Sequence, residues 1–252
     1  MSGYVDLHCH LLPGVDDGAR TPADALEMAR ALVEVGVATV AVTPHARAGY
    51  APVEVCVQRL DELRRALGEG GVPLALALSA ENALVEEGFL EALGTPAARP
   101  VHQGPYVLVE LPYSAPVPAL PALVFQMMRK GVIPLLAHPE RCLELQRPGR
   151  AAEVVALGAR LQLDVGALSG RYGPAARRTA RTLLDDGLYA VAATDLHAPA
   201  GARRWIERAL AELRACAGDP AVERLFRDGP GRILRGETVE MPEAGRVDGG
   251  SS

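Results

Sequence analysis

Short apolar runs alternate with helix-like segments along most of the chain. Seven of these runs are rich in leucine or β-branched residues, as buried strands are; they span residues 4–8, 39–43, 74–80, 106–111, 133–137, 161–165 and 189–193. Amphipathic segments of helical period separate nearly all of them. The pattern therefore predicts repeated βα units with parallel strands, and hence an α/β barrel of seven strands.

The first predicted helix has the clearest boundaries. Thr21 has the side chain of an N-cap, Pro22 suits the first helical position, and Gly36 marks the end. Similar glycines precede the fifth, sixth and seventh predicted strands. We expect the apolar face of this helix to consist of Leu26, Ala29, Leu32 and Val33.

The length of the chain suits one such barrel. Of 252 residues, 49% are hydrophobic, so a full core can form. Residues 1–235 contain no low-complexity linker, and we expect them to form a single domain. Residues 236–252 contain few apolar side chains, so we expect a disordered C-terminal tail.

Charge and segment composition narrow the class of protein. A net charge of -5 and a pI near 5.7 disfavour binding to the nucleic-acid backbone. Neither a signal peptide nor a run long enough to span a bilayer is recognisable, so we expect a cytoplasmic protein without membrane insertion. The four cysteines are scattered without a Cys-x-x-Cys pair, which favours reduced core thiols.

Side chains suited to metal binding follow the predicted strands. Residues i and i+2 of a strand face the same side, so His8 and His10 can bind one ion, and Asp195 and His197 repeat this spacing. The other strand ends carry His45, Glu81, Glu110 and His138. Barrel enzymes place their chemistry at the carboxyl ends of strands, so we expect these side chains to converge. Nitrogen and carboxylate ligands without thiolate suit Mn²⁺, Fe²⁺ or Zn²⁺ in a hydrolytic site.

Other polar residues have simpler interpretations. Asp16 and Asp17 precede a glycine and suit a turn. His102 lies in a loop ahead of a strand and is expected at the surface. Asp164 lies inside the sixth predicted strand, where it would either face the barrel interior or accept hydrogen bonds from backbone donors.

Several motifs together resemble the PHP (polymerase and histidinol phosphatase) superfamily, whose members are distorted seven-stranded barrels that bind up to three metal ions. These motifs are His8-x-His10, Thr43-Pro44-His45, Glu81, Ala137-His138-Pro139 and Asp195-x-His197. Within this superfamily, the segments LLPGVDDGA, VTPH, SAEN, LVELP and LLAHPERC are similar to the bacterial manganese-dependent protein-tyrosine phosphatases of capsule and exopolysaccharide operons. The resemblance covers nearly the whole chain and implies a distorted (β/α)7 TIM-like barrel.

The resemblance also implies a ligand set for up to three ions, most simply Mn²⁺, with Fe, Zn or Co as alternatives. It assigns His8, His10, Glu81 and Asp195 to one ion, Glu81, Glu110 and His138 to a second, and Asp17, His45 and His197 to a third.

Arginines that contact phosphate are implied as well. Arg141 matches one such arginine of the family. The second lies about one place earlier in the family than Arg203 does here, so we predict Arg203, with Arg204 as the alternative. Arg47 is a further candidate at the mouth of the site, and a solvated loop residue is the equal alternative.

The implied reaction is hydrolysis of phosphotyrosine by metal-activated water, with Arg141 and Arg203 neutralising charge on the phosphoryl oxygens. The implied substrate is the phosphorylated tail of a bacterial tyrosine kinase that regulates polysaccharide synthesis. Cysteine-based phosphatase chemistry is disfavoured, because the spacing from Cys142 to Arg147 is one residue short of Cys-x5-Arg. The alternatives are histidinol-phosphate phosphatase, a nuclease, which the acidic charge disfavours, and a non-catalytic metal-binding scaffold. The sequence leaves the oligomeric state open.

Overall fold

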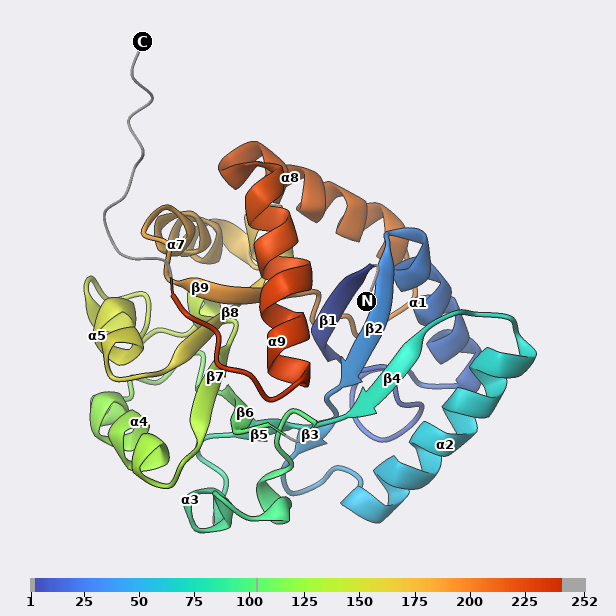
Figure 1. Ribbon diagram of the computed structural model, residues 1–252, viewed down its shortest axis with the longest axis horizontal. Coiled ribbons are helices and arrows are strands. Elements are labelled where there is room, and N and C mark those ends of the chain that lie inside the picture. The colour runs from blue at the N-terminus through green and yellow to red at the C-terminus, as the bar shows by residue number, and fades with distance from the viewer. Residues whose placement is uncertain (1–2, 103, 242–252) are drawn as a thin grey trace.

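The computed structural model describes residues 3–102 and 104–241 (Figure 1). Within them, parallel strands form two sheets, of order β1-β2-β4 and β3-β5-β6-β7-β8-β9. The strands are β1 (Tyr4–Cys9), β2 (Val37–Val42), β3 (His45–Ala46), β4 (Ala75–Leu78), β5 (Glu81–Ala83), β6 (Tyr106–Glu110), β7 (Ile133–Ala137), β8 (Arg160–Asp164) and β9 (Tyr189–Ala193). The α/β class with parallel strands is therefore as predicted.

The number of strands differs from the prediction, because two of the predicted strands are each followed by a second, short one. After β2 the chain passes through Thr43 and Pro44 and continues as β3, and after β4 it passes through Ser79 and Ala80 and continues as β5. The two parts pair with different neighbours: β2 with β1 and β4, but β3 with β5. Proline has no N–H to donate to a sheet, which explains the break before β3. The seven predicted strands thus correspond to nine strands in the described residues, because two of the seven are each interrupted.

The two sheets contact each other on both sides. Beyond β4, the Ser79 N–H donates to the Val42 carbonyl at 2.9 Å, where the smaller sheet passes into the larger. Beyond β9, Leu196 forms an isolated parallel bridge with Cys9 of β1, and its carbonyl accepts from the His10 N–H at 3.0 Å. The carboxyl ends of β1 and β9 therefore lie side by side.

Helices surround the strands on the outside, and α9 crosses one end of them (Figure 1). The helices are α1 (Pro22–Glu34), α2 (Val53–Glu69), α3 (Phe89–Ala92), α4 (Leu120–Arg129), α5 (Arg150–Ala156), α6 (Val165–Leu168), α7 (Gly173–Asp185), α8 (Ala202–Glu223) and α9 (Gly229–Leu234). Within the described residues, every helix is too short or too polar to cross a bilayer.

Helix α1 begins where the sequence predicted. The Thr21 hydroxyl accepts from the Asp24 N–H at 3.1 Å, and the Asp24 carboxylate accepts from the Thr21 N–H at 3.0 Å, which is a complete capping box. Gly36, after its end, has a φ of 94°, which favours glycine. The buried face is shifted from the prediction, since Leu26 and Val33 are only half-buried. Its buried residues are Ala25, Met28, Ala29, Ala31 and Leu32.

The first part of the predicted tail is ordered. Val239 is 6% exposed; its N–H donates to the Tyr106 hydroxyl at 2.8 Å, and its carbonyl accepts from Arg160 Nε at 2.8 Å. Val239 and Met241 supply the apolar surface that lets residues 236–241 pack against the core. The prediction of disorder from residue 236 was therefore wrong for residues 236–241, and residues 242–252 lie outside the described residues.

Candidate metal centre

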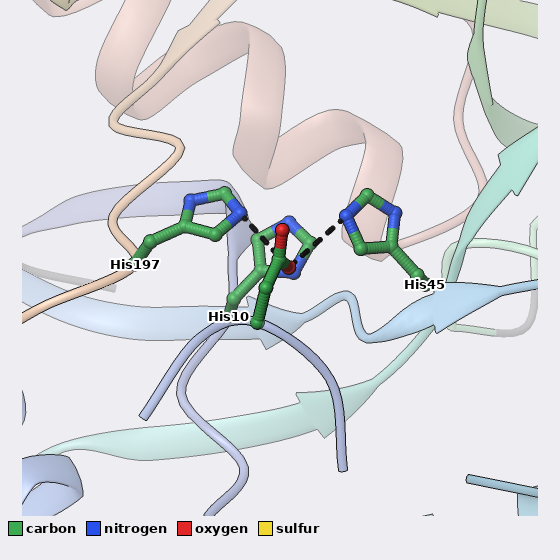
Figure 2. A group of neighbouring side chains, drawn as sticks. His10, His45 and His197 are labelled. Carbon is green, nitrogen blue, oxygen red and sulfur yellow. Dashed lines mark ion pairs between the residues drawn. The ribbon is translucent and has the colours of Figure 1, made fainter. Parts of the chain in front are cut away.

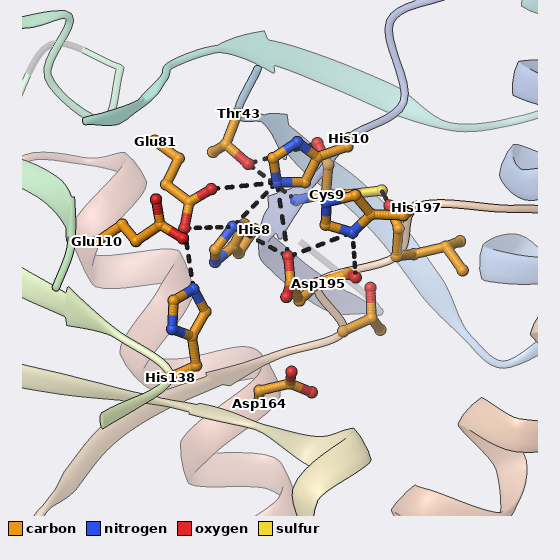
Figure 3. A network of polar contacts seen from close by, with 12 residues as sticks. His8, Cys9, His10, Thr43, Glu81, Glu110, His138, Asp164, Asp195 and His197 are labelled. Atoms are coloured by element: carbon orange, nitrogen blue, oxygen red, sulfur yellow. Dashed lines mark hydrogen bonds and ion pairs between the residues drawn. The ribbon is translucent and has the colours of Figure 1, made fainter. Parts of the chain in front are cut away.

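The structure brings all of the predicted ligands to the carboxyl ends of the strands, as Figure 3 shows for most of them. Their ligand atoms form four overlapping groups, with members of each group within 4.8 Å of one another. The groups are His8, His10 and Glu81; His8, His138 and Asp195; His45, Glu81 and Glu110; and His10, Asp17, His45 and His197. Side chains up to 189 positions apart in the chain thus converge at one edge of the fold.

Two of these residues have unusual backbone angles. His138 follows β7 with a φ of 34°, and Asp195 follows β9 with a φ of 51°. A non-glycine residue with such an angle costs free energy, of order 1–3 kcal/mol, and persists where the surrounding structure imposes it. At both positions the angle accompanies a side chain that faces the ligand cluster rather than continuing the strand.

Hydrogen bonds on the far side of the rings fix the proton positions of His8 and His10. His8 Nδ1 lies 2.8 Å from Gln162 Oε1, and the amide group of Gln162 donates to the Leu163 carbonyl at 2.9 Å. Gln162 Oε1 therefore accepts, and His8 Nδ1 carries the proton. His10 Nδ1 likewise donates to Asp16 Oδ2 at 2.8 Å. In each neutral ring, Nε2 is left with a lone pair that faces the cluster, the arrangement that metal-binding histidines have.

The Nε2 atoms of His8 and His10 lie close to the carboxylates of Glu81 and Asp195. The Nε2 atoms of His8 and His10 lie 3.2 Å apart, and His8 Nε2 lies 3.2 Å from Asp195 Oδ1 and 3.4 Å from Glu81 Oε1. All four side chains are buried, and Asp195 Oδ1 is buried without a hydrogen-bond partner. Buried carboxylates and lone pairs directed at the same space repel one another unless positive charge compensates them. The donor set therefore fits a divalent cation.

The nearby carboxylates also raise the pKa values of His8 and His10. Burial disfavours the charged form of His8, but the carboxylates of Glu81 and Asp195 outweigh it and raise its pKa to about 9. The pKa of His10 is also raised against the effect of burial, by Asp16, Asp195 and Glu81. Without a metal ion, then, protons on the His8 and His10 rings compensate the negative charge of the carboxylates. A metal ion would have to displace these protons, since only the neutral ring binds metal.

A second group of ligands includes His10, His45 and His197 (Figure 2). His45 and His197 face each other across Asp17, whose Oδ1 lies 3.3 Å from His45 Nε2 and 3.5 Å from His197 Nε2. His197 Nδ1 donates to the Asp195 carbonyl at 2.8 Å, which again leaves Nε2 with the lone pair. The Asp17 side chain is 54% exposed, whereas those of His8 and His10 are fully buried. An ion held here would be the more accessible one.

The remaining ligand group consists of His45, Glu81 and Glu110, and His138 also contacts Glu81. His138 Nε2 is 2.9 Å from Glu81 Oε1, and His45 Nδ1 is 2.9 Å from Glu81 Oε2. Glu110 lies at the end of β6, where its Oε1 accepts from the Tyr113 hydroxyl at 2.6 Å. Glu81 therefore reaches histidines on both sides, as a carboxylate that bridges two ions would.

Two of the predicted arginines lie at the cluster. Arg141 Nη1 donates to Asp195 Oδ2 at 2.7 Å and lies 3.5 Å from Asp164 Oδ2. Arg47 Nη1 lies 3.3 Å from Glu110 Oε2. Both guanidinium groups are thus next to predicted ligands, where a bound anion could reach them. Their contact with phosphate stays a prediction.

The other two arginines are not brought to the cluster. Gly201 ends the loop after β9, and Arg203 lies on the first turn of α8, where Nε donates to Glu207 at 2.8 Å and Nη1 to Glu34 of α1 at 3.2 Å. Arg204 is exposed on the same turn. The start of α8 directs Arg203 toward α1, so the structure corrects the expectation that Arg203 contacts the site.

Sequence reasoning missed two polar partners of the ligands. Asp16 has the predicted turn role, since its Oδ1 accepts from the Gly18 N–H at 3.0 Å, but its other oxygen also orients His10. Gln162 lies in the apolar strand β8, on the same face as Asp164 two residues later, and this alternation was the available signal. Asp164 itself is fully buried and caps α6 through a 2.8 Å bond from the Gly166 N–H.

The structure also places the residues expected to lie outside the site. His102 is exposed and has a φ of 54°. Cys142 is 1% exposed, and burial raises the pKa of its thiol, which disfavours the thiolate that a nucleophile needs.

A family model described as capsular polysaccharide synthesis, CpsB/CapC, matches residues 4–235. The chain belongs to this family. Among proteins similar to the chain, the tyrosine-protein phosphatase YwqE of Bacillus subtilis is 32% identical over 196 residues, 77% of each chain. The tyrosine-protein phosphatase CpsB of Streptococcus pneumoniae is 23% identical over 243 residues, 93% of this chain and 100% of that one.

A solved structure has a similar fold. It comes from crystallographic work on YwqE from Bacillus subtilis and CpsB from Streptococcus pneumoniae, called unique metal-dependent tyrosine phosphatases. It matches with a TM-score of 0.85 and 27% identity, over 95% of this chain and 98% of the other. The likeness therefore extends over nearly the whole fold that positions the ligand cluster.

Proposed function

We propose that the protein is a metal-dependent phosphatase that hydrolyses phosphotyrosine in proteins. The observation that carries the proposal is the convergence of His8 Nε2 and His10 Nε2, which have lone pairs in the neutral rings, with the buried carboxylates of Glu81 and Asp195. Relatives named tyrosine-protein phosphatases and metal-dependent tyrosine phosphatases support the same activity.

The residues of the chain have distinct tasks in this reaction. Divalent cations held by the ligand cluster would supply positive charge to the phosphoryl oxygens and make water nucleophilic at neutral pH. Arg141, 20% exposed and next to Asp195, would donate N–H groups to a non-bridging phosphate oxygen. Asp16 and Gln162 would hold the His10 and His8 rings in position. Phenol has a pKa of about 10, so a phosphotyrosine leaving group demands less of a general acid than an alkyl phosphate does.

The finer features of the proposal follow the resemblance. We propose Mn²⁺ as the metal, with up to three ions, and the tail of a tyrosine kinase of capsular polysaccharide synthesis as the substrate, in the cytoplasm. We further propose that the described residues form a single domain in which the two sheets make one distorted (β/α)7 barrel. The contacts between the sheets beyond β4 and β9 support this closure.

The test compares substrates and variants of the full chain. With Mn²⁺, the protein should hydrolyse a phosphotyrosine peptide, and Glu81→Gln should lower kcat/KM by about a thousandfold, because Glu81 contacts both halves of the cluster. His102→Asn is the matched control: His102 is exposed and outside the cluster, and asparagine tolerates its positive φ. It should leave kcat/KM unchanged.

Other outcomes would reject the proposal in distinct ways. Faster turnover of histidinol phosphate than of the peptide would identify a small-molecule phosphatase. Absence of turnover of either substrate, in a protein that binds Mn²⁺, would favour a metal-binding scaffold.

A further inference from the structure

The guanidinium group of Arg141 lies between two aromatic rings. Its Cζ atom is 4.5 Å from the ring centroid of Tyr113 and 4.3 Å from that of Tyr172. The three residues come from different loops: Tyr113 follows β6, Arg141 follows β7, and Tyr172 precedes α7. Stacking from two loops on a third is a tertiary feature that no local pattern of the sequence indicates.

The edge of the same guanidinium group faces the cluster. Nη1 is 2.7 Å from Asp195 and 3.5 Å from Asp164. Guanidinium N–H groups lie in the plane of the group, so rings that contact its faces leave the edge free for hydrogen bonds. A flexible arginine side chain between two carboxylates has several rotamers available. The rings restrict it to those in which its edge faces Asp195.

Tyr172 is itself held in place from three directions. Burial and the negative charge of Asp164 raise the pKa of its hydroxyl, which keeps Tyr172 neutral beside that carboxyl group. Gly166 leaves room for it, since a Cβ atom there would be 3.2 Å from Tyr172 Cε2 and 3.0 Å from Asp164 Oδ1. The preceding residue, Arg171, donates its backbone N–H to the Gly166 carbonyl at 3.1 Å and stacks its guanidinium group over Trp205 of α8 at 4.4 Å. The position of the Tyr172 ring is therefore built into the fold.

Tyr113 forms the other wall. It is 40% exposed, and its hydroxyl donates to Glu110 at 2.6 Å, which ties the ring to a predicted ligand. Its backbone carbonyl accepts from the Leu143 N–H at 3.2 Å, so its loop is joined to the segment that carries Arg141. The exposed ring makes Tyr113 the wall at the mouth of the site, and the less exposed Tyr172 the wall behind it.

We propose that Tyr172 and Tyr113 are positioning residues that hold Arg141 in the orientation in which it binds the phosphate group of the substrate. This inference rests on the proposed phosphatase function. Neither tyrosine needs to touch the reacting atoms, because each acts through the guanidinium group. The contribution of each ring to phosphate binding should therefore be present only while Arg141 is present.

The experiment measures binding of inorganic phosphate to the Mn²⁺-loaded protein by calorimetry, alongside KM and kcat for a phosphotyrosine peptide. Tyr172→Leu should weaken phosphate binding and raise KM by about tenfold with a smaller change in kcat, while Tyr172→Phe, which keeps the ring, should stay within about twofold of the wild type. Tyr113→Leu, at the exposed wall, should act in the same direction if Tyr172→Leu fails to fold. Tyr4→Leu, at the opposite end of the strands, is the matched control and should change neither quantity.

A double-mutant cycle decides between positioning and general damage to the fold. In an Arg141→Gln background, Tyr172→Leu should have no further effect on phosphate binding. Tyr113→Leu should there weaken phosphate binding no more than Tyr113→Phe, which keeps the ring and loses only the hydrogen bond to Glu110. An equal effect with and without Arg141, or a Tyr172→Phe protein as weak as Tyr172→Leu, would overturn the inference. A wild type that binds phosphate but does not hydrolyse the peptide would instead reject the proposed function, and the binding data would still test the tyrosines.

Discussion

The two ends of the strands are built on opposite principles. At the carboxyl ends, buried histidines and carboxylates face one another, and His138 and Asp195 have strained backbone angles. At the amino ends, α9 and residues 236–241 cover an apolar cluster that includes Ile233 and Tyr106. Gly229, at the start of α9, packs so closely that a Cβ atom there would be 2.7 Å from the Ala190 carbonyl of β9.

The difference teaches where stability and function are located in this fold. Apolar burial at the amino ends stabilises the chain without any ligand. The carboxyl ends bring like charges and lone pairs together, which opposes folding unless protons or metal cations compensate them. Barrel enzymes in general separate a stabilising end from a reactive end in this way.

The largest effect should come from removing one buried carboxylate charge at the carboxyl ends. Asp195→Asn should lower kcat/KM by about a thousandfold, because Asp195 faces His8, His10 and Arg141. It should also abolish the rise in Tm that Mn²⁺ gives the wild type, a stabilisation of about 4 kcal/mol at a metal concentration of a thousand times Kd. Thermal unfolding with Mn²⁺ and with chelator measures this.

Asp219→Asn is the matched control for that prediction. Asp219 pairs with Arg214 on the surface and its side chain is 79% exposed. Its replacement should preserve both activity and the metal-dependent Tm. If Asp195→Asn retained the Mn²⁺-dependent rise in Tm, the cluster would not be the metal site.

The opposite result is expected at the amino ends. Ile233→Ala should lower the free energy of unfolding by about 2–5 kcal/mol, because Ile233 is fully buried in the apolar cluster and its truncation leaves a cavity. The kcat/KM of the folded protein should not change. Denaturant unfolding, and activity at a temperature where the variant is folded, check the two parts.

Leu157→Ala controls for loss of an apolar side chain as such. Leu157 is 37% exposed, so its truncation should change the free energy of unfolding by less than about 0.5 kcal/mol. A large loss of activity in folded Ile233→Ala would contradict the separation of the two ends.

A smaller effect is expected from pH on the affinity of the carboxyl-end cluster for Mn²⁺. The pKa of His8 is raised to about 9 in the metal-free protein, so His8 is protonated at neutral pH, and a metal ion must displace the proton. Apparent Mn²⁺ affinity should therefore rise with pH between 6.5 and 8.5, by up to about tenfold per pH unit for each proton displaced. The contribution of His8 to this rise should cease above its pKa.

Calorimetric titration with Mn²⁺ at three pH values in two buffers of different ionisation enthalpy gives both the affinity and the protons released. An affinity independent of pH, without proton release, would contradict protonation of His8 in the metal-free protein. His102→Asn should follow the wild type at every pH.

Local patterns predicted the parts of this protein that depend on neighbours in sequence. The capping box of α1 follows from Thr21 and Asp24, and the strand ends follow from apolar runs that stop at polar residues. The same local reading missed the break at Pro44, and it placed the apolar face of α1 slightly off, because packing against other helices selects which residues are buried.

The candidate site divides in the same way. The spacing of His8 and His10 placed both rings on one side of a strand, which requires only the alternation of side chains. The roles of Gln162 and Asp16 depended on which residues the other strands and loops bring behind those rings. The prediction that Arg203 lies at the site was wrong, because the path of the loop into α8 directs this side chain toward Glu34 of α1.

By itself, the sequence determined which side chains are available to bind metal and at which strand ends they lie, since strand periodicity and helix capping act over a few residues. Only the tertiary structure decided which ring nitrogens carry lone pairs, which carboxylates they meet, and that two tyrosines enclose Arg141. Those features depend on the register and packing of segments far apart in the chain, which no local pattern specifies.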